Sequence, residues 1–385
     1  MAKTQTLNSN DKFKIKSYFY KSLNSNNIIQ NHNLFKFILF LVYNILISNA
    51  AYIQLKVNGI GNQQILSDYY DIEKYYPFRI FINDNEVQIL REKKVLISKI
   101  TDIIKLEWIH PYHNLSYLFA NVSSITSITM SNMINQNTNI SYMFYNCISL
   151  QNFSMINNPA NIVDNFVGDM RYMFYNCYSL NNFSFDKFRF DNYIDISYIF
   201  YNCSNLKYVT YNTNNNIKVK DMRYSFYNCN SLVSINFNKF ETSGCINMSY
   251  AFYNCFTFDS ITINNYLQIN DMRFLFFNNT GLKYINIKFS YDCKYNMSYS
   301  FYNCKNLQTF SCNNWLIRPN DMRNMFFNSA NLISIEFELG RNANDVNMTR
   351  MFYNCNNISI VKFKETYYYS YYYYPSDLHA MFYII

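Results

Sequence analysis

Residues 221–237, DMRYSFYNCNSLVSINF, carry the pattern that decides the fold of this chain. In this stretch Phe226 is followed by a cysteine at +3 and by apolar residues at +6, +9 and +11. The same register recurs at ten marker phenylalanines, which are 24 to 30 residues apart: Phe119, Phe144, Phe174, Phe200, Phe226, Phe252, Phe276, Phe301, Phe326 and Phe352. A fixed period in this range indicates a solenoid of stacked coils, since helical-pair repeats need about 33 residues or more. Function is therefore expected on a repeated surface.

The spacing of apolar residues within one unit predicts two walls for each coil. Met222, Phe226 and Cys229 stand at 0, +4 and +7, which predicts a short helix or 3₁₀ turn. After the cysteine, the pattern L-x-x-I-x-F alternates with polar residues and predicts a short strand of a parallel sheet. The expected fold class is an α/β repeat, a curved, right-handed solenoid of the leucine-rich type with coils of ~25 residues.

Stacked coils bring equivalent residues into ladders. One coil cannot bury its own apolar face, so each ladder residue gains its stability from neighbouring coils. The predicted structural ladders consist of Phe144, Phe174, Phe200, Phe226, Phe252, Phe301 and Phe352, and of Cys147, Cys177, Cys203, Cys229, Cys255, Cys304 and Cys355. Val122, Asn279 and Ser329 replace the cysteine in three coils, and this exchange indicates a packing position rather than a metal or redox site.

The tripeptide Asp-Met-Arg recurs at every second coil, beginning at Asp169, Asp221, Asp271 and Asp321. An aspartate two residues before an arginine, at the start of the predicted helix, indicates a helix cap and an ion pair with the neighbouring coil. The alternation suggests that a two-coil unit was duplicated.

Residues 170–185, MRYMFYNCYSLNNFSF, and the connector at residues 240–248, FETSGCINM, resemble the repeats of BspA-type leucine-rich-repeat surface proteins. The resemblance extends from about residue 115 to the end of the chain. It implies a leucine-rich-type solenoid in a secreted or cell-surface protein that adheres to host components, matrix or other cells. Asn228 and Asn254 stand where glycine is frequent in the family, and asparagine also tolerates a left-handed backbone.

The N-terminal residues predict export. Residues 1–33 form a basic arm, and residues 34–51 contain the apolar run LFKFILFLVYNILI followed by small residues. This order predicts a signal peptide cleaved near Ala50. An uncleaved signal anchor is one alternative, and a buried part of the cap is another. Residues 52–114 predict a small β-rich N-terminal cap, and residues 115–385 predict the solenoid of ten coils and a partial one.

The net charge of +8 does not point to a nucleic-acid partner. Residues 1–51 contain six lysines and one aspartate, so +5 belongs to the arm and +3 remains on the other 334 residues. No basic stripe for phosphate binding is left in the repeats.

The sequence offers no catalytic or metal site. Seven of the ten cysteines stand at the ladder register, where burial is expected, and the off-register Cys245, Cys293 and Cys312 are better candidates for disulfides without an assigned partner. His110 and His113 alone are too few for a metal site, and they are expected in a surface turn of the cap. There is no C-x-x-C, H-E-x-x-H, G-x-S-x-G or Walker motif, so we expect neither an enzyme nor a cofactor.

The outward positions of the predicted strands, at +8 and +10 from each marker phenylalanine, form the candidate binding face. They are rich in hydroxyls and amides, with aromatic side chains at two of the +8 positions, and tyrosine supplies rigid, amphipathic contact area. The candidate binding residues are Tyr208, Asn236, Thr262, Tyr284, Asn286, Ser311 and Glu336. A surface protein or a glycan is the expected partner, and the alternative is a solvated face without a ligand.

These observations favour an exported, non-catalytic adhesion or recognition protein at the cell surface or outside the cell. The alternative is an intracellular protein-interaction scaffold. A membrane is expected to be contacted only through an N-terminal anchor. The repeat motif restarts at Leu378 and the sequence ends at Ile385, which predicts either self-association through an uncovered apolar end or a truncated product.

Overall fold

The computed structural model describes residues 51–69, 77–87, 93–108, 112–134, 138–156, 167–186, 188–190, 192–211, 216–289, 294–312, 318–338 and 346–364. The chain divides into Met1–Asn49 and Ala50–Ile385, and every described residue belongs to the second part. Of the predicted arm and apolar run, only Ala51 is described, as the first residue of a strand. The predicted basic arm, signal peptide and anchor otherwise lie outside the described residues.

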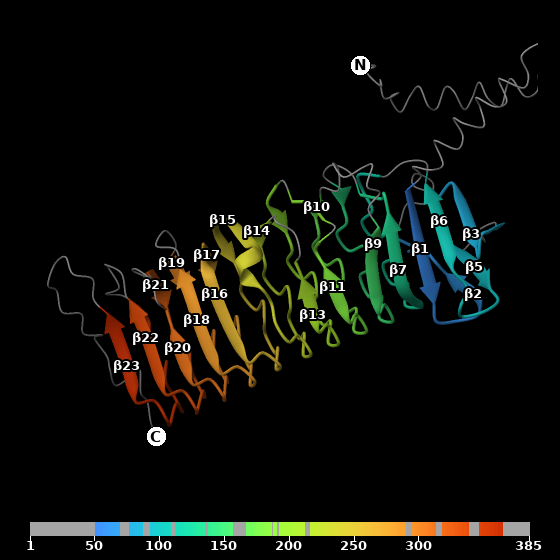
Figure 1. Cartoon of the computed structure of the whole chain (residues 1–385). Coiled ribbons are helices and arrows are strands. Elements are labelled where there is room, and N and C mark those ends of the chain that lie inside the picture. Colours follow the sequence, from blue (N-terminus) through green and yellow to red (C-terminus); the bar gives the residue numbers. More distant parts are fainter. Residues whose placement is uncertain are drawn as a thin grey trace, which may run out of the picture. The chain divides into compact units, whose positions relative to one another are not determined.

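Among the described residues, six strands precede the first repeat (Figure 1): β1 (Ala51–Val57), β2 (Gly61–Gln64), β3 (Arg79–Ile82), β4 (Asn85–Val87), β5 (Lys94–Ile97) and β6 (Ile104–Trp108). Ile53 and Leu55 on β1 are buried, with half-buried Gln54 between them, as the two-residue period of a strand requires. β1 pairs antiparallel with β6 on one side and with the first repeat strand, β7, on the other. This end segment and the repeats therefore share one sheet.

The first wall of the solenoid, here called the sheet wall, consists of parallel strands that follow one another in sequence order. They are β7 (Ile125–Ser131), β9 (Asn152–Ile156), β11 (Asn182–Ser184), β13 (Tyr208–Thr210), β16 (Ser260–Leu267), β18 (Tyr284–Phe289), β20 (Thr309–Ser311), β22 (Ser334–Glu338) and β23 (Ile360–Lys364). The coil of Phe226 interrupts this wall: it offers only a bridge between Tyr208 and Ser234 and the 3₁₀ turn η2 (Phe237–Lys239). The wall thus consists of two sheets.

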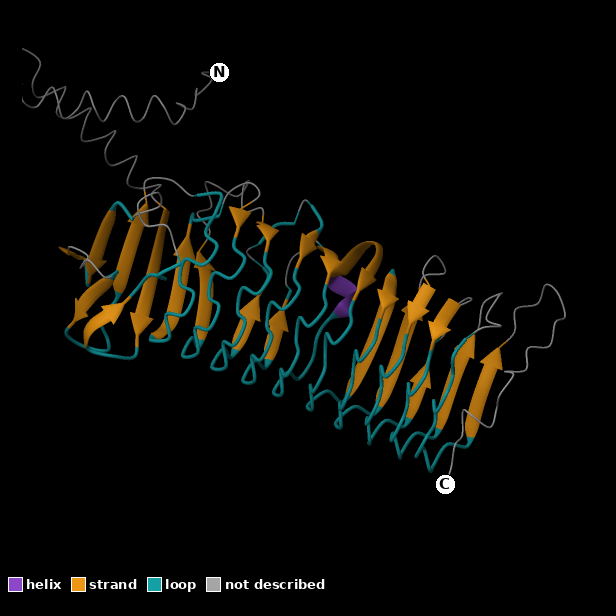
Figure 2. Cartoon of the chain, turned by 180° about the vertical axis from the view of Figure 1, so that it is seen from behind, coloured by secondary structure: helices purple, strands orange, loops and turns teal. Residues whose placement is uncertain are grey.

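The second wall contains the strands that lead into each turn (Figure 2), and all of them except β15 have two to five residues. They are β8 (Thr138–Asn139), β10 (Val167–Asp169), β12 (Ile194–Asp195), β14 (Ile217–Asp221), β15 (Phe240–Asn247), β17 (Ile269–Asp271), β19 (Lys294–Asn296) and β21 (Arg318–Asp321). These strands also pair in parallel with the next coil. Both walls therefore obtain their backbone hydrogen bonds from neighbouring coils.

The helical turn predicted from the apolar spacing is wrong, and the fold is a β-solenoid rather than an α/β repeat. The segment from Met222 to Cys229, and its equivalents, is a series of turns, here called the turn wall. Tyr224 and Asn228 have φ of 57° and 56°, and a left-handed residue at every fourth position prevents a helix from propagating. Because the left-handed residues are four positions apart, the turns bring apolar side chains inward every three to four residues, which is the spacing that indicated a helix.

The backbone of the turn wall is hydrogen-bonded along the solenoid. Within one turn wall, amides at alternate positions donate to the next coil, as Tyr224 does to Ser249 and Phe226 to Ala251. The amides between them close four-residue β-turns within the coil, as Cys229 does to Phe226. A wall without helix or strand therefore has its amides satisfied.

The marker phenylalanines stack as a buried ladder inside the turn wall. Neighbouring rings lie 5.1 to 5.8 Å apart between centroids, from Phe119 to Phe352. Each is at most 2% exposed. Burying a phenylalanine contributes roughly 1.5 to 3 kcal/mol, so this ladder is a main source of cohesion between coils.

The cysteine position is a hydrogen-bonding position as well as a packing position. The thiol of Cys229 donates to the carbonyl oxygen of Phe200 in the preceding coil over 3.1 Å, and the other six ladder cysteines make the equivalent bond. Asn279 Nδ2 and Ser329 Oγ donate to the same carbonyl of their preceding coils. Val122 belongs to the first coil, which has no preceding marker phenylalanine. The interpretation of these exchanges as packing alone therefore missed the donor.

Candidate functional site

The sheet wall positions five of the seven candidate binding residues on one continuous sheet. Thr262 lies on β16, Tyr284 and Asn286 on β18, Ser311 on β20 and Glu336 on β22. The parallel register places Thr262, Asn286, Ser311 and Glu336 in one row that continues to Lys362 on β23. Adjacent strands lie about 4.7 to 4.9 Å apart, so this row is a ladder of mixed hydroxyl, amide and charged groups.

The other two candidates lie at the interruption of the sheet wall. Tyr208 begins β13, the last strand of the first sheet. Asn236 does not lie on a strand as predicted; its Oδ1 accepts a hydrogen bond from the amide of Asn238 and caps the 3₁₀ turn. The interruption therefore separates Tyr208 and Asn236 from the other candidates.

The two candidate tyrosines are the exposed aromatic side chains among the candidate residues. Tyr208 is 51% exposed and Tyr284 is 47% exposed. They belong to coils three steps apart, about 14 Å at the usual strand spacing, so they do not form one aromatic cluster. The hydroxyl of Tyr284 donates to Oε1 of Gln308 over 2.9 Å, which fixes its ring over the neighbouring coil.

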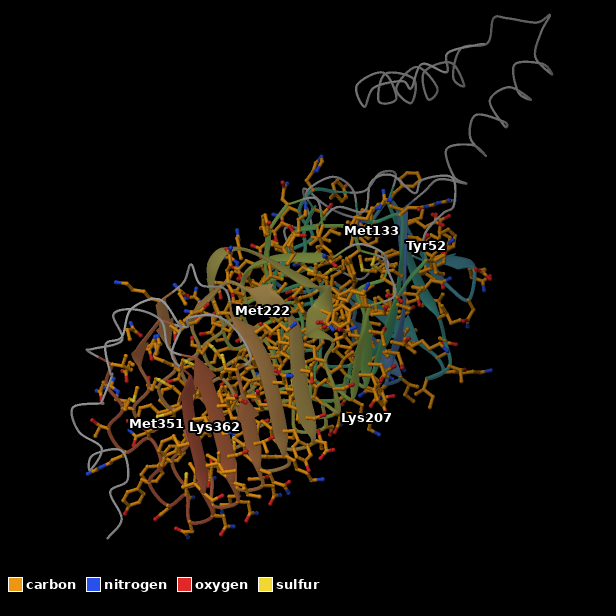
Figure 3. All side chains as sticks on the ribbon, turned by 60° about the vertical axis from the view of Figure 1, so that its left-hand side comes forward. Tyr52, Met133, Lys207, Met222, Met351 and Lys362 are labelled. Carbon is orange, nitrogen blue, oxygen red and sulfur yellow. The ribbon has the colours of Figure 1, made fainter. Side chains whose placement is uncertain are left out.

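Electrostatically, the face is close to neutral along its row. Glu336 and Lys362 stand opposite each other in the register of β22 and β23. Oδ1 of Asn286 is buried and has no hydrogen-bond partner among the described residues. Lys207, just before β13, and Lys362 are exposed, whereas Met222 and Met351 are buried within their coils (Figure 3).

The positions at +7 from the marker phenylalanines form a further column beside the strands, which the sequence analysis did not include in the binding face. Val233, Ile333 and Ile360 are each about 44% exposed, and the first two belong to this column. The carbonyl of Ile333 accepts the amides of Ser359 and Ile360, so the two isoleucines lie on neighbouring coils. An apolar residue among polar ones at +7 is visible in the sequence, and it could have signalled this patch.

Two columns of stacked aromatic rings on the turn wall were also missed. The first column, at −2 from the marker phenylalanine, has centroid distances of 4.5 to 4.7 Å along Tyr117, Tyr142, Tyr172, Tyr198, Tyr224, Tyr250, Phe274 and Tyr299. The second, at +1, has distances of 4.5 to 4.8 Å along Tyr145, Tyr175, Tyr201, Tyr227, Tyr253, Phe277, Tyr302, Phe327 and Tyr353. The tyrosines that recur in motifs such as SYMFYNC are the sequence signal that could have indicated these two columns.

An asparagine ladder runs beside the second column, at +2. Each Nδ2 donates to Oδ1 of the preceding coil, over 2.7 to 2.9 Å in seven of the eight steps between Asn121 and Asn328. Every asparagine of this ladder has a φ near +60°. Asparagine therefore meets both requirements of the position, a left-handed backbone and an amide to pair.

The Asp-Met-Arg motif forms an ion pair inside one coil, not with the neighbouring coil as predicted. Arg171 Nη2 lies 2.8 Å from Oδ2 of Asp169, and the other three motifs pair in the same way. The aspartate oxygen also accepts the amide of the arginine, so it caps a turn rather than a helix. Each of these half-exposed pairs is neutral.

A comparison with known families agrees with this repeat. The sequence model described as a BspA type leucine rich repeat region, of six copies, matches residues 115–243, 170–308 and 220–359. The chain belongs to the BspA-type leucine-rich-repeat family. No curated protein and no solved structure matches the chain.

Membership in the BspA-type family bears on function at a coarse level. Its repeats are those of proteins for protein interaction, often associated with bacterial cell surfaces, and the family is typically non-enzymatic. Within the described residues of this BspA-type chain, no group of three His, Cys, Asp or Glu side chains could hold a metal ion. Among those same residues no helix is long and apolar enough to span a membrane.

The thiols of this BspA-type repeat are held in their protonated form. Burial raises the pKa of Cys304 from 9.0 to about 12 and that of Cys355 likewise. It also raises the pKa of Cys203 and Cys229 well above 9.0. A nucleophilic cysteine needs a lowered pKa and access, so these residues stabilise the structure instead. Cys312 is buried, and the side chains of Cys245 and Cys293 lie outside the described residues.

Proposed function

We propose that this chain is a non-catalytic recognition protein that binds a surface protein or a glycan through its sheet wall. The observation that carries the proposal is the in-register row from Thr262 to Glu336, flanked by the exposed ring of Tyr284. Hydroxyl and amide groups on a rigid sheet, beside an amphipathic ring, suit the mixture of polar and apolar contacts that protein and glycan surfaces offer.

Family membership supports this proposal because repeats of this family belong to proteins for protein interaction, and solenoids bind partners through extended surfaces. The secretory or cell-surface location is part of the proposal, and it depends on the predicted signal peptide or anchor in residues 34–51. Self-association through the C-terminal end is likewise proposed only from the sequence, since residues 365–385 lie outside the described part of the chain.

A matched pair of tyrosine variants tests the face. Tyr284→Ala removes the ring on the sheet wall, whereas Tyr178→Ala removes a ring of similar exposure, 42%, that directly follows the ladder residue Cys177 and precedes β11. With the full chain, binding to cells and to an array of glycans should weaken about tenfold for Tyr284→Ala, within the usual range for an aromatic contact residue. Binding by Tyr178→Ala should equal that of the wild type. Equal loss in both variants, or in neither, would refute the assignment of the face.

The alternative is an intracellular scaffold that uses the same face. Surface labelling and protease shaving of intact cells separate the two, because an exported repeat is cleaved from outside and a cytoplasmic one is protected. N-terminal sequencing of the native protein then distinguishes a cleaved signal peptide, with a start near Ala51, from an intact arm.

A further inference from the structure

The two tyrosine columns are more regular than stability alone requires, because phenylalanine serves in the same stacks. Phe274 lies 4.6 Å from Tyr250 and Phe277 lies 4.7 Å from Tyr253, with nearly parallel rings in both pairs. Phenylalanine provides the same stacking without a hydroxyl. Tyrosine nevertheless occupies six successive coils of the first column and five of the second. The phenol group therefore calls for a chemical explanation.

The columns bring phenol rings of neighbouring coils face to face. Nine pairs of tyrosines stack within a column, with centroids 4.5 to 4.8 Å apart and planes within 10°. Because the stacked rings are parallel and related by one coil, the ortho carbons of neighbouring rings lie about as far apart as the ring centroids. Tyr117 is exposed and the other tyrosines of the nine pairs are half-buried, so the columns are accessible to solvent along the turn wall.

We propose that the two tyrosine columns are a site of oxidative cross-linking, at which a haem peroxidase with hydrogen peroxide joins tyrosines of neighbouring coils as dityrosine. Each phenol gives up one electron and its hydroxyl proton and becomes a phenoxyl radical. Two such radicals on adjacent coils form one carbon–carbon bond between their ortho positions, and the ortho protons move to the oxygens. Two phenols and one peroxide thus yield one biphenol and two water molecules.

The electrostatics of the columns agree with a radical route. Burial raises the pKa of Tyr142, Tyr175 and Tyr227 from 10.0 to about 12. At physiological pH these phenols are neutral, and their one-electron oxidation also releases the hydroxyl proton. Each link closes a loop of one coil in the unfolded chain, which reduces the entropy of that chain and stabilises the solenoid.

The chain contains its own internal controls. Phe274 and Phe277 end the uninterrupted runs of tyrosine in the same coil. Tyr302 stacks between Phe277 and Phe327, and Tyr353 stacks on Phe327, so neither has a tyrosine neighbour within its column. Links should therefore map to residues 117–253, with none within the second column beyond residue 277.

The test treats the dilute full chain with a haem peroxidase and hydrogen peroxide. We expect dityrosine fluorescence in the monomer, an intact mass lower by two hydrogen atoms for each link, and cross-linked peptides that join tyrosines one coil apart. Links that occur only between molecules, or that map mainly to Tyr208, Tyr284 or residues 367–374, would overturn the proposal.

Two sets of five substitutions sharpen the test. One set interrupts every stacked pair of tyrosines within the columns: Tyr142→Phe, Tyr198→Phe, Tyr250→Phe, Tyr175→Phe and Tyr227→Phe. The matched set leaves the columns intact: Tyr69→Phe, Tyr178→Phe, Tyr193→Phe, Tyr208→Phe and Tyr284→Phe. The first should lose most of the intramolecular dityrosine and the second should retain it, while equal yields from both would refute the site. If the first set fails to fold, Tyr198→Phe alone should lose only the links to Tyr172 and Tyr224.

Discussion

The turn wall and the sheet wall of this solenoid differ in how strongly each coil constrains the next. In the turn wall, each phenylalanine, asparagine and cysteine contacts its own equivalent or the backbone beside it, so a change in one coil affects two neighbours. On the sheet wall the outward side chains are exposed or half-buried, and the +8 position varies from Ser234 to Tyr284 to Ile360. Residues that repeat without change therefore mark the scaffold, and residues that vary mark the face that we propose for recognition.

Removal of a central ring of the phenylalanine ladder should reveal the largest difference in stability between the two walls. Phe226→Ala leaves a cavity between the rings of Phe200 and Phe252, and we expect a loss of about 3 to 5 kcal/mol in the free energy of unfolding. Ser234→Ala, on the sheet wall of the same coil, should change it by no more than about 0.5 kcal/mol. Urea denaturation monitored by circular dichroism measures both. Similar values for the two variants would contradict the assigned roles of the walls.

The asparagine ladder should show the next largest effect. Asn228 donates to Asn202 and accepts from Asn254, at a φ of 56°. Asn228→Gly keeps the left-handed backbone and loses two hydrogen bonds, for about 1 to 2 kcal/mol. Asn228→Ala adds backbone strain of about 1 to 2 kcal/mol. If alanine proved no worse than glycine in urea denaturation, the positive φ would not be a constraint.

The cysteine position should prefer a donor to an apolar group. Cys229→Val removes the hydrogen bond to the carbonyl of Phe200 and should cost about 1 kcal/mol. Cys229→Ser keeps a donor, as Ser329 does in its own coil, and should be the more stable of the two variants. If Cys229→Val proved more stable than Cys229→Ser in thermal or urea denaturation, the cysteine would contribute to stability through packing alone.

Alkaline pH should weaken the turn wall through its buried phenols and thiols. Burial raises the pKa of Tyr224 from 10.0 to about 12 and that of Cys304 from 9.0 to about 12. Because these values are raised in the folded state, the unfolded chain ionises first. The stabilisation is complete below pH 9 and is lost between pH 9 and about 12. The urea concentration at the midpoint of unfolding should therefore fall as the pH rises through this range. Above pH 10 the fall should be less steep in the variant with five Tyr→Phe substitutions in the columns. A flat profile would contradict the burial of these groups.

The repeat register was predictable from sequence because the ladders are made of identical residues, and the spacing of Phe226, Cys229 and Leu232 survives in most coils. The helix was predicted wrongly because a left-handed residue at every fourth position produces nearly the same apolar spacing as a helix. Only backbone angles separate the two, and Tyr224 at positive φ is not a residue that sequence reasoning would place there. The place of Asn236 was missed because the interruption of the sheet wall has no signature in the register of Ile235 and Phe237.

Hydrogen exchange of the turn wall, followed by mass spectrometry on peptides that cover residues 222–229, tests the central claim most directly. Every amide from Met222 to Cys229 is hydrogen-bonded, either to the next coil or within its own turn. We predict that these amides exchange as slowly as those of β16, with no helical signal in the far-ultraviolet circular dichroism. Exchange at the rate of an open surface turn, or a helical spectrum, would contradict the account of the turn wall as the scaffold of this solenoid.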